Sequence, residues 1–533
     1  MKNYLFLFFL FIFLIFVVNP IGDFPLNDDW RYAYPVMSWL ETGSISMSDD
    51  FAPTILLQVI WAYFFSLPFG DFSFTTLRFS VLILAFLGIG FFYRTTLELT
   101  SSKKVAFFGA IVLMLNPLYF NLSFSFMTDV PFLFTCLATI FAMYFYFKKD
   151  EKKYLIFIIL GSIASFLIRQ PGILFLPVLG LMMLWKKIDK SSILSFVGML
   201  LLSAAVYMSF DVFLKPLMNI EKAYVPVTQL FYDYFLENPL SFVLEIFKKL
   251  VKTIIYIGFF SLPILPFIFG KIKSIGGLNK KIIFPLLIFN IGLLFFLHSI
   301  GKIFPFGGNI MYNFGLGPEL LKDTYTLEMA NTPRLPMWTM YFFNFIGQVV
   351  GCWIILMIIK TFHSLSDLQK RFFKFLFLLN AIYLPLMSIT SFYDRYLLLT
   401  FASVFLYSML FVDLTKAKLQ NMIYLLPIVL MSYFAIAGTK DYLSWHRTKL
   451  EAFHFLEKEK VDLKKIDAGF ELNGWYNFQE GWESPDHLSF WWVNDDEYII
   501  SFGKIDGYDV LKKYPFWSAL HFQNQNILIL KRR

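Results

Sequence analysis

Residues 105–147 read VAFFGAIVLMLNPLYFNLSFSFMTDVPFLFTCLATIFAMYFYF and contain a single charged residue, Asp129, between Lys104 and Lys148. Each of the two apolar runs, 105–122 and 130–147, approaches the roughly 20 residues that a helix needs to cross a hydrocarbon core of about 30 Å. The stretch therefore predicts a hairpin of two membrane-spanning helices, with Asp129 at the membrane surface between them.

The composition of the whole chain agrees with a lipid environment. The 533 residues are 58% hydrophobic and 16% charged, with a mean hydropathy of +0.62, whereas a soluble domain carries about 25% charged residues. The net charge of +8 does not indicate nucleic-acid binding, because Lys and Arg occur in short clusters between apolar segments. Cys136 and Cys352 lie inside apolar segments, so no structural disulfide is predicted.

About thirteen such segments occur along the chain and predict an all-α polytopic membrane protein. Short basic connections, which the positive-inside rule places in the cytoplasm, alternate with connections that are longer or nearly free of Lys and Arg. This alternation predicts a cytoplasmic N-terminus and an outer face that includes connections 19–73, 123–129, 215–249 and 301–337. The first segment is predicted to be retained, because no small-residue cleavage site follows it. The segments are 4–18, 74–93, 105–122, 130–147, 154–168, 171–185, 192–214, 250–269, 282–300, 338–359, 372–391, 396–413 and 420–437.

The end of the chain has mixed charge and no further apolar segment. Residues 441–460 predict an amphipathic helix. Strands are predicted at 466–470, 497–502 and 527–530, with turn signals at Asn473-Gly474 and Ser484-Pro485. We therefore expect a transmembrane domain at 1–439 and a small extracytoplasmic α/β domain at 440–533.

The first outer connection carries two adjacent carboxylates, Asp28 and Asp29. Neighbouring carboxylates repel each other, which raises one pKa and can keep a general base poised. One of the pair would alternatively cap an interfacial helix over residues 30–41. The two interpretations are compatible and both stay open.

Asp129 in the second outer connection has the same two interpretations. An ionisable group at membrane depth is costly and is by default a functional candidate. However, an Asp shortly before Pro131 is also typical of a helix start.

Single arginines occur near the outer ends of apolar segments: Arg169 in the tight turn 168–172, Arg395 beside Asp394, and Arg78. Each is either an anchor that snorkels to the interface or a donor to phosphate oxygens, which a planar guanidinium binds through paired hydrogen bonds. Asp394 would alternatively neutralise Arg395. No Cys or His cluster has metal-ligand spacing and no Gly-rich phosphate loop is found, so no metal and no cofactor are predicted.

These features resemble the GT-C superfamily of glycosyltransferases, in particular the branch of protein O-mannosyltransferases and aminoarabinose–lipid A transferases. Residues 28–33 (DDWRYA) are similar to the acidic start of the first outer loop in that branch, and residues 128–131 (TDVP) to its second-loop Asp. Residues 394–398 (DRYLL) resemble a late Arg-Tyr-Leu-x-Pro element without its proline, and residues 466–475 resemble the tail of bacterial relatives. Residues 51–54 (FAPT) stand where aminoarabinose relatives carry Lys-Pro-Pro, which argues against that sugar.

The resemblance implies an inverting transferase that uses a polyprenyl- or dolichyl-phosphate sugar. Asp28 would be the general base that takes the proton of the acceptor hydroxyl, with Asp29 its neighbour. Asp129 would orient the region of Asp28 or the acceptor. The leaving group is a lipid phosphate, so a cation rather than an acid is expected to stabilise its departure. The arginines expected to bind the donor phosphate are Arg169, then Arg395, with Arg78 a further candidate.

Carboxylates on the outer face fit such a donor independently, because nucleotide sugars are cytoplasmic and a lipid carrier brings the sugar across. The long connections 215–249 and 301–337 would cover a groove. The expected location is the bacterial inner (plasma) membrane, and the expected partners are membrane lipid, the sugar donor and a glycan, lipid or protein acceptor. Alternatives are a transporter or lipid flippase, a polysaccharide polymerase or ligase, and a non-catalytic scaffold. A transporter predicts deep ionisable residues and an internal repeat, and the sequence shows neither clearly.

Overall fold

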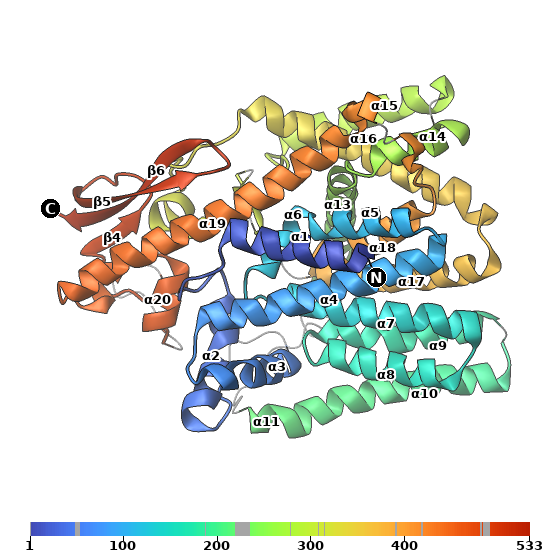
Figure 1. Cartoon of the computed structure of the whole chain (residues 1–533), viewed down its shortest axis with the longest axis horizontal. Coiled ribbons are helices and arrows are strands. Elements are labelled where there is room, and N and C mark those ends of the chain that lie inside the picture. The colour runs from blue at the N-terminus through green and yellow to red at the C-terminus, as the bar shows by residue number, and fades with distance from the viewer. Residues whose placement is uncertain are drawn as a thin grey trace.

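The described part of the chain is mostly helical, with a small sheet near the C-terminus (Figure 1). The computed structural model describes residues 2–47, 54–186, 188–218, 235–277, 279–306, 309–313, 315–389, 392–416, 419–479, 482 and 491–533. The predicted fold class, a helical membrane core followed by a C-terminal α/β unit, is confirmed. The segment 51–53 and the predicted turn Ser484-Pro485 lie outside the described residues.

In the first half of the chain, apolar helices run side by side along the long axis of the molecule (Figure 1). Helix α4 packs against both α5 and α7, and α7 packs against α8. The helix path bends by 66° between α5 and α6, because Asn116 caps a new helix whose first residue is Pro117. The helices are α1 (Lys2–Val18), α2 (Asp29–Thr42), α3 (Leu56–Ser66), α4 (Phe74–Thr100), α5 (Lys103–Met114), α6 (Pro117–Ser123), α7 (Asp129–Lys149), α8 (Lys152–Phe166), η2 (Gln170–Leu174), α9 (Phe175–Lys186), α10 (Lys190–Ser209), η3 (Phe210–Leu214) and α11 (Lys215–Leu217).

The second half continues the helical core. Helix α13 begins at Pro239, so the outer connection predicted to reach residue 249 ends about ten residues earlier; residues 219–234 of that connection lie outside the described part. A bend of 112° separates α13 from α14. The elements are α13 (Pro239–Phe260), α14 (Leu265–Ser274), α15 (Lys280–Ser299), β1 (Met311–Tyr312), β2 (Gly315–Leu316), η4 (Lys322–Thr326), α16 (Met337–Thr361), α17 (Asp367–Ile389), η6 (Asp394–Leu397), α18 (Leu398–Met409) and α19 (Leu426–Lys458).

Several helices are long and apolar enough to cross a membrane. Within the described residues there are 6, or up to 8 when each bent pair is taken as one span, and three shorter apolar helices accompany them. The chain is therefore a multi-pass membrane protein, while the span count of about thirteen stays a prediction. The six are Phe74–Thr100, Asp129–Lys149, Lys190–Leu214, Lys280–Ser299, Met337–Ser364 and Met422–Lys458.

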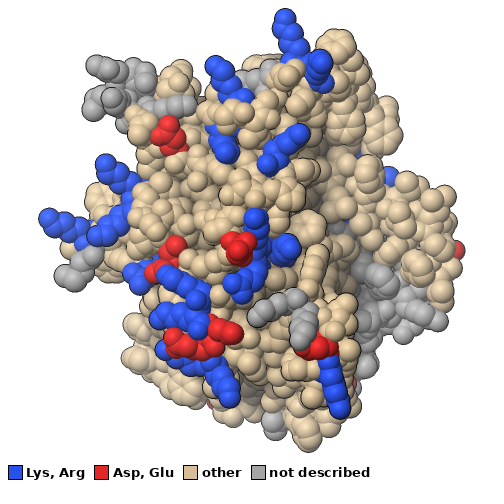
Figure 2. Space-filling view, turned by 90° about the vertical axis from the view of Figure 1, so that its right-hand side faces the viewer, with Lys and Arg blue, Asp and Glu red and all other residues tan. Residues whose placement is uncertain are grey.

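The basic connections meet at one end of the bundle. Lys148 forms an ion pair of 2.8 Å with Glu98, so the connections after α4 and α7 are neighbours. Gln369 donates a hydrogen bond of 3.3 Å to the carbonyl of Leu99, which brings the start of α17 to the same place. Lys and Arg side chains stand out on this end in Figure 2. The C-terminal unit lies at the opposite end (Figure 1), as the alternation of loop charge predicts.

The C-terminal unit is joined to the core by one continuous helix. Helix α19 has 33 residues and runs through position 440, the predicted domain boundary. The sheet that follows has the order β3-β4-β6-β5, with β3 parallel to β4 and the other pairs antiparallel. Strand β5 was not predicted. The remaining elements are β3 (Ile466–Asp467), α20 (Phe470–Asn477), β4 (Tyr498–Ser501), β5 (Tyr508–Ser518) and β6 (Gln523–Arg532).

The turn predicted at Asn473-Gly474 is wrong, because both residues lie in α20. Asn473 instead accepts the N–H of Ala468 and donates to Asp467, which joins the helix to β3. A Cβ at position 474 would stand 2.5 Å from the indole of Trp30. The glycine therefore permits α20 to approach α2 closely.

Candidate active site

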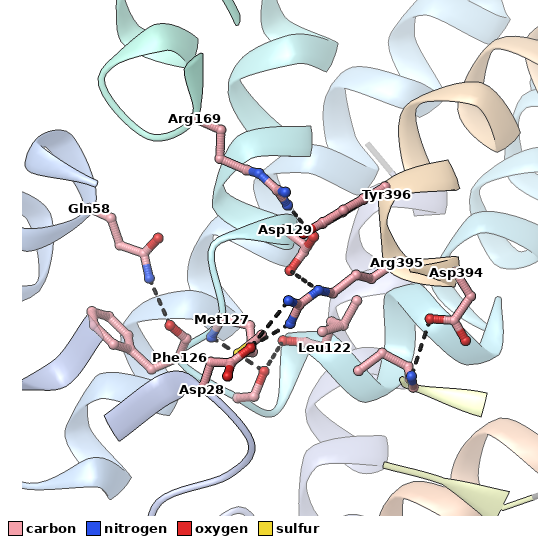
Figure 3. Close-up of polar contacts among 12 residues, drawn as sticks. Asp28, Gln58, Leu122, Phe126, Met127, Asp129, Arg169, Asp394, Arg395 and Tyr396 are labelled. Carbon is pink, nitrogen blue, oxygen red and sulfur yellow. Dashed lines mark hydrogen bonds and ion pairs between the residues drawn. The ribbon is translucent and has the colours of Figure 1, made fainter. Parts of the chain in front are cut away.

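Arg395 links the first and second outer connections (Figure 3). Its Nη2 donates to Asp28 Oδ2 at 3.2 Å, and its Nε lies 3.9 Å from Asp129 Oδ2. The side chains of Arg395 and Asp129 are 6% and 2% exposed, whereas that of Asp28 is 29% exposed. Three residues that lie far apart in the sequence thus form one cluster. Of its two carboxylates, that of Asp28 is the more accessible to solvent.

Asp129 also holds Arg169. The Arg169 guanidinium donates to Asp129 Oδ1, and the side chain of Arg169 is 13% exposed. The ring of Tyr396 lies under both guanidiniums, 4.5 Å from that of Arg169 and 5.5 Å from that of Arg395. Such cation–π contacts orient guanidinium planes. Tyr396 is thus a further residue of the site, which the sequence indicated only through the Arg-Tyr element.

Asp29 has a different environment from its neighbour. It is fully buried, and its carboxylate accepts the N–H of Leu26 at 2.6 Å and of Phe126 at 3.2 Å. Burial raises the pKa of Asp29 to about 7, against the opposing effects of Arg78 and of the two backbone hydrogen bonds. Asp29 therefore ties the first outer connection to the second, and it stays away from solvent.

The capping interpretation fails for the side chains of Asp28 and Asp129. Asp28 occupies the N-cap position of α2, but its side chain makes no capping hydrogen bond. Asp129 is the first residue of α7, after the N-cap Thr128. Both carboxylates bind arginines instead. The interfacial helix predicted over residues 30–41 is present as α2 (Asp29–Thr42).

Arg78 is not part of this cluster. It is fully buried in α4 and donates to the carbonyls of Pro20 at 3.0 Å, Gly22 at 2.7 Å and Phe24. All three carbonyls belong to the segment between the end of α1 and Asp28. Arg78 thus holds the first outer connection in place, and we do not retain it as a donor-phosphate ligand.

Asp394 does not neutralise Arg395 by direct pairing. Its carboxylate accepts the N–H of Ile310 at 3.1 Å and of Met311 at 2.7 Å. In Figure 3 the carboxylate of Asp394 points away from Arg395. Burial raises the pKa of Asp394 to about 6. Asp394 therefore holds the connection 301–337 against η6, while Arg395 turns to Asp28 and Asp129.

Gln58 is a further site-supporting residue that the sequence analysis missed. It is buried in α3, and its amide donates to the carbonyl of Phe126 at 2.9 Å. Just before α3, the chain also contacts the tight turn 168–172, since the N–H of Ile55 donates to the carbonyl of Ile168 at 3.2 Å. An amide among the apolar residues of 56–65 was the available signal.

The C-terminal unit packs onto the acidic connection. Trp30, next to Asp29, lies against the aromatic rings of Phe478 and Trp492 at centroid distances of 5.4 and 5.5 Å. Close by, Lys449 and Glu471 form a fully buried ion pair of 2.9 Å between α19 and α20. These contacts fix the unit relative to α2, which carries the site.

The cluster combines a partly accessible carboxylate, Asp28, with a cation that has an unused donor, Arg395. Its four charged side chains, Asp28, Asp129, Arg169 and Arg395, balance in charge. Among the described residues, Arg395 Nε and Asp129 Oδ2 have no hydrogen-bond partner, although both are buried. Buried donors without partners are costly, and an anionic ligand at Arg395 would relieve that cost. The arrangement is suited to deprotonating a hydroxyl beside a bound phosphate.

The comparison with protein families agrees with this class of site. A profile of dolichyl-phosphate-mannose-protein mannosyltransferases matches residues 53–213. This match confirms the predicted resemblance to glycosyltransferases of the GT-C superfamily. Within that superfamily, the matched family is that of the protein mannosyltransferases, and the matched range contains Asp129 and Arg169.

Two kinds of solved structure are similar over much of the chain. The ArnT of Cupriavidus metallidurans, bound to undecaprenyl phosphate, is 12% identical with a TM-score of 0.39, over 99% of this chain and 97% of that chain. The oligosaccharyltransferase of Archaeoglobus fulgidus, in complex with Zn and sulfate, is 13% identical with a TM-score of 0.37, over 87% of this chain and 56% of that chain. No curated protein matches the chain.

Proposed function

We propose that the chain is an inverting glycosyltransferase that moves a sugar from a polyprenyl-phosphate carrier to an acceptor hydroxyl at the outer face of the membrane. The observation that carries the proposal is the bridge from Arg395 to Asp28 and Asp129. It places an accessible carboxylate beside a cation with an unused donor, which are the two groups that this reaction needs.

In the proposed reaction, the acceptor oxygen attacks the anomeric carbon of the sugar. Asp28 takes the proton of that hydroxyl, a new glycosidic bond forms, and the bond from the anomeric carbon to the phosphate oxygen breaks. The polyprenyl phosphate leaves with the bonding electron pair. A single displacement from the opposite side inverts the anomeric configuration.

The leaving phosphate gains negative charge, so donors already in place stabilise it without reorganisation. Arg395 and Arg169 are the proposed donors. Their pairing with Asp28 and Asp129 holds the guanidiniums in position before the donor binds. Binding of the phosphate at Arg395 would loosen its contact with Asp28 and leave that carboxylate free to act as the base.

The proposed orientation supports a lipid-linked donor. The cluster and the basic connections lie at opposite ends of the helical core, and basic connections are cytoplasmic under the positive-inside rule. We propose that the membrane is the bacterial inner membrane, with the N-terminus in the cytoplasm and the C-terminal unit outside. The acceptor is a glycan, a lipid or a protein hydroxyl.

The test is genetic complementation. Cells that lack the protein are compared with wild-type cells for their glycolipids and glycans, and the product that disappears is the readout. Asp28→Asn in the full chain should lower its formation by about 10²- to 10⁴-fold, the usual contribution of a general base. Glu41→Gln, an exposed carboxyl on the same helix α2, is the control and should restore the product fully. Full restoration by Asp28→Asn at equal membrane expression would show that Asp28 is not the base.

Sidedness has its own test. A cysteine placed at position 41, in the exposed part of α2, should react with an impermeant thiol reagent in intact cells. Reaction only after the cells are broken would place the cluster on the cytoplasmic side and contradict the use of a lipid-linked donor.

A further inference from the structure

A cavity of about 720 Å³ opens at the basic end of the helical core, away from the candidate active site. It lies between the C-terminal ends of α7 and α9 and the N-terminal parts of α10 and α17. Two residues of the first turns of α10, Ser192 and Ser195, line one side. Figure 2 faces this end of the molecule, where Lys and Arg side chains gather.

The rim of the cavity is strongly basic. Lys148, Lys149, Arg371 and Lys374 line it, with Asp150 as the acidic residue among the lining side chains. Lys148 is already paired with a carboxylate outside the cavity. Within the described chain, Arg371 and Lys374 form no ion pair. The cavity therefore offers cationic donors from α17 that its own acid does not neutralise.

The floor of the cavity is apolar. Leu179 and Met182 are buried beneath the rim, and Met183 lies beside them. Trp185 stands at the edge with 62% of its surface exposed, and Lys374 Nζ lies 5.2 Å from its ring. Exposed Trp beside Lys is typical of the level of lipid headgroups. The cavity thus has charge at headgroup level and apolar surface on the membrane side.

We propose that this cavity binds the headgroup of an anionic phospholipid from the cytoplasmic leaflet. Arg371 and Lys374 would bind the phosphate, the hydroxyl of Ser195 would add a hydrogen bond, and the acyl chains would lie along Met183 and the exposed apolar face of α10. Basic pockets between membrane helices on the cytoplasmic side are known to bind such headgroups. The site takes no part in the proposed glycosyl transfer, and its assignment to the cytoplasmic leaflet rests on the orientation proposed above.

The experiment uses the full chain, purified in a non-ionic detergent. Native mass spectrometry counts bound 1-palmitoyl-2-oleoyl-phosphatidylglycerol, with the phosphatidylcholine of the same acyl chains as the neutral lipid. We expect the phosphatidylglycerol to bind more tightly to the wild type. The variant Arg371→Gln/Lys374→Gln should weaken that binding about 25-fold, since each cation near an anionic lipid contributes about fivefold.

The control is Lys280→Gln/Lys281→Gln, which removes two exposed cations from the start of α15 outside the cavity. It should leave phosphatidylglycerol binding unchanged. Both double variants should keep the unfolding temperature of the wild type, because all four substitutions replace rim or surface side chains.

Three results would overturn the proposal. Equal binding of the two lipids by the wild type excludes a site for anionic headgroups. An equal loss in both double variants shows diffuse attraction by surface charge. Displacement of phosphatidylglycerol by millimolar inorganic phosphate shows a site for soluble phosphate instead of a lipid.

Discussion

The pair Asp129–Arg169 allows a double-mutant test of the electrostatics of the site. Asp129→Asn leaves two buried guanidiniums facing a neutral amide, and Arg169→Gln leaves Asp129 with Arg395 at 3.9 Å. Each substitution breaks a buried ion pair, and removal of one partner of such a pair costs about 3–5 kcal/mol. Solvent screens little here, because the two side chains are 2% and 13% exposed.

The double variant Asp129→Asn/Arg169→Gln removes both charges together. Arg395 then loses one partner but keeps Asp28 at 3.2 Å, so the free energy of unfolding should fall by less than the sum of the two single effects. Residues in direct contact couple by about 0.5–3 kcal/mol, and we expect a coupling near the upper end, about 2–3 kcal/mol.

The assay is unfolding of the full chain by sodium dodecyl sulfate in mixed micelles, followed by tryptophan fluorescence. Glu41→Gln serves as the exposed control and should change the free energy of unfolding by less than about 0.5 kcal/mol. Strictly additive effects of the two substitutions would refute the reasoning, because they would mean that the pair is screened as if it were on the surface.

Further predictions concern the residues around the site. Because burial raises the pKa of Asp29 from 3.8 to about 7, the folded state holds a proton that the unfolded chain has lost. Stability should therefore fall as pH rises from about 4 to about 7, and Asp29→Asn should flatten this slope in unfolding temperatures measured across that range. Arg78→Lys should cost about 1.5–3 kcal/mol, the range for hydrogen bonds of a charged group, because one ammonium cannot reproduce the planar fork that reaches three carbonyls; an unchanged unfolding temperature would argue against this role. Gly258→Ala should lower the unfolding temperature, because its Cβ would stand 1.9 Å from the carbonyl oxygen of Gly347 and overpacking costs about 1–3 kcal/mol or more. Gly292→Ala in α15, where a Cβ meets nothing within 4 Å, should not lower the unfolding temperature in the same assay, because alanine is the better helix former.

The helical core was predictable because lipid imposes a length and a composition on each span. The run 130–147 needed no knowledge of its neighbours, since a hydrocarbon solvent forces its backbone to form its own hydrogen bonds. The run 105–122, predicted as one span, is instead broken between α5 and α6 by a bend of 66°. The C-terminal unit was less predictable. The glycine at position 474 indicated a turn, yet it lies in a helix and its small size allows close contact with Trp30. Trp30 lies more than four hundred positions earlier in the sequence, so the local pattern could not show this contact.

The candidate site was predictable in its residue types but not in its pairing. Loop position and isolated charge indicated Asp28, Asp129, Arg169 and Arg395 as ionisable groups near one membrane face. The sequence did not show that Arg395 binds Asp28 across 367 positions. Asp394 is directly adjacent to Arg395 in the chain, but it points to the backbone of another connection.

By itself, the sequence determined that the chain lies in a membrane, that its connections alternate in charge and that its acids gather on one face. These properties follow from the transfer of side chains between water and lipid, which depends on local composition. Only the tertiary structure decided that Asp28 is partly accessible while Asp29 is buried, and that Arg78 supports a loop while Arg395 meets two carboxylates. These outcomes depend on which backbone groups and charges the packed helices bring within hydrogen-bonding distance, and spacing along the chain does not encode that distance.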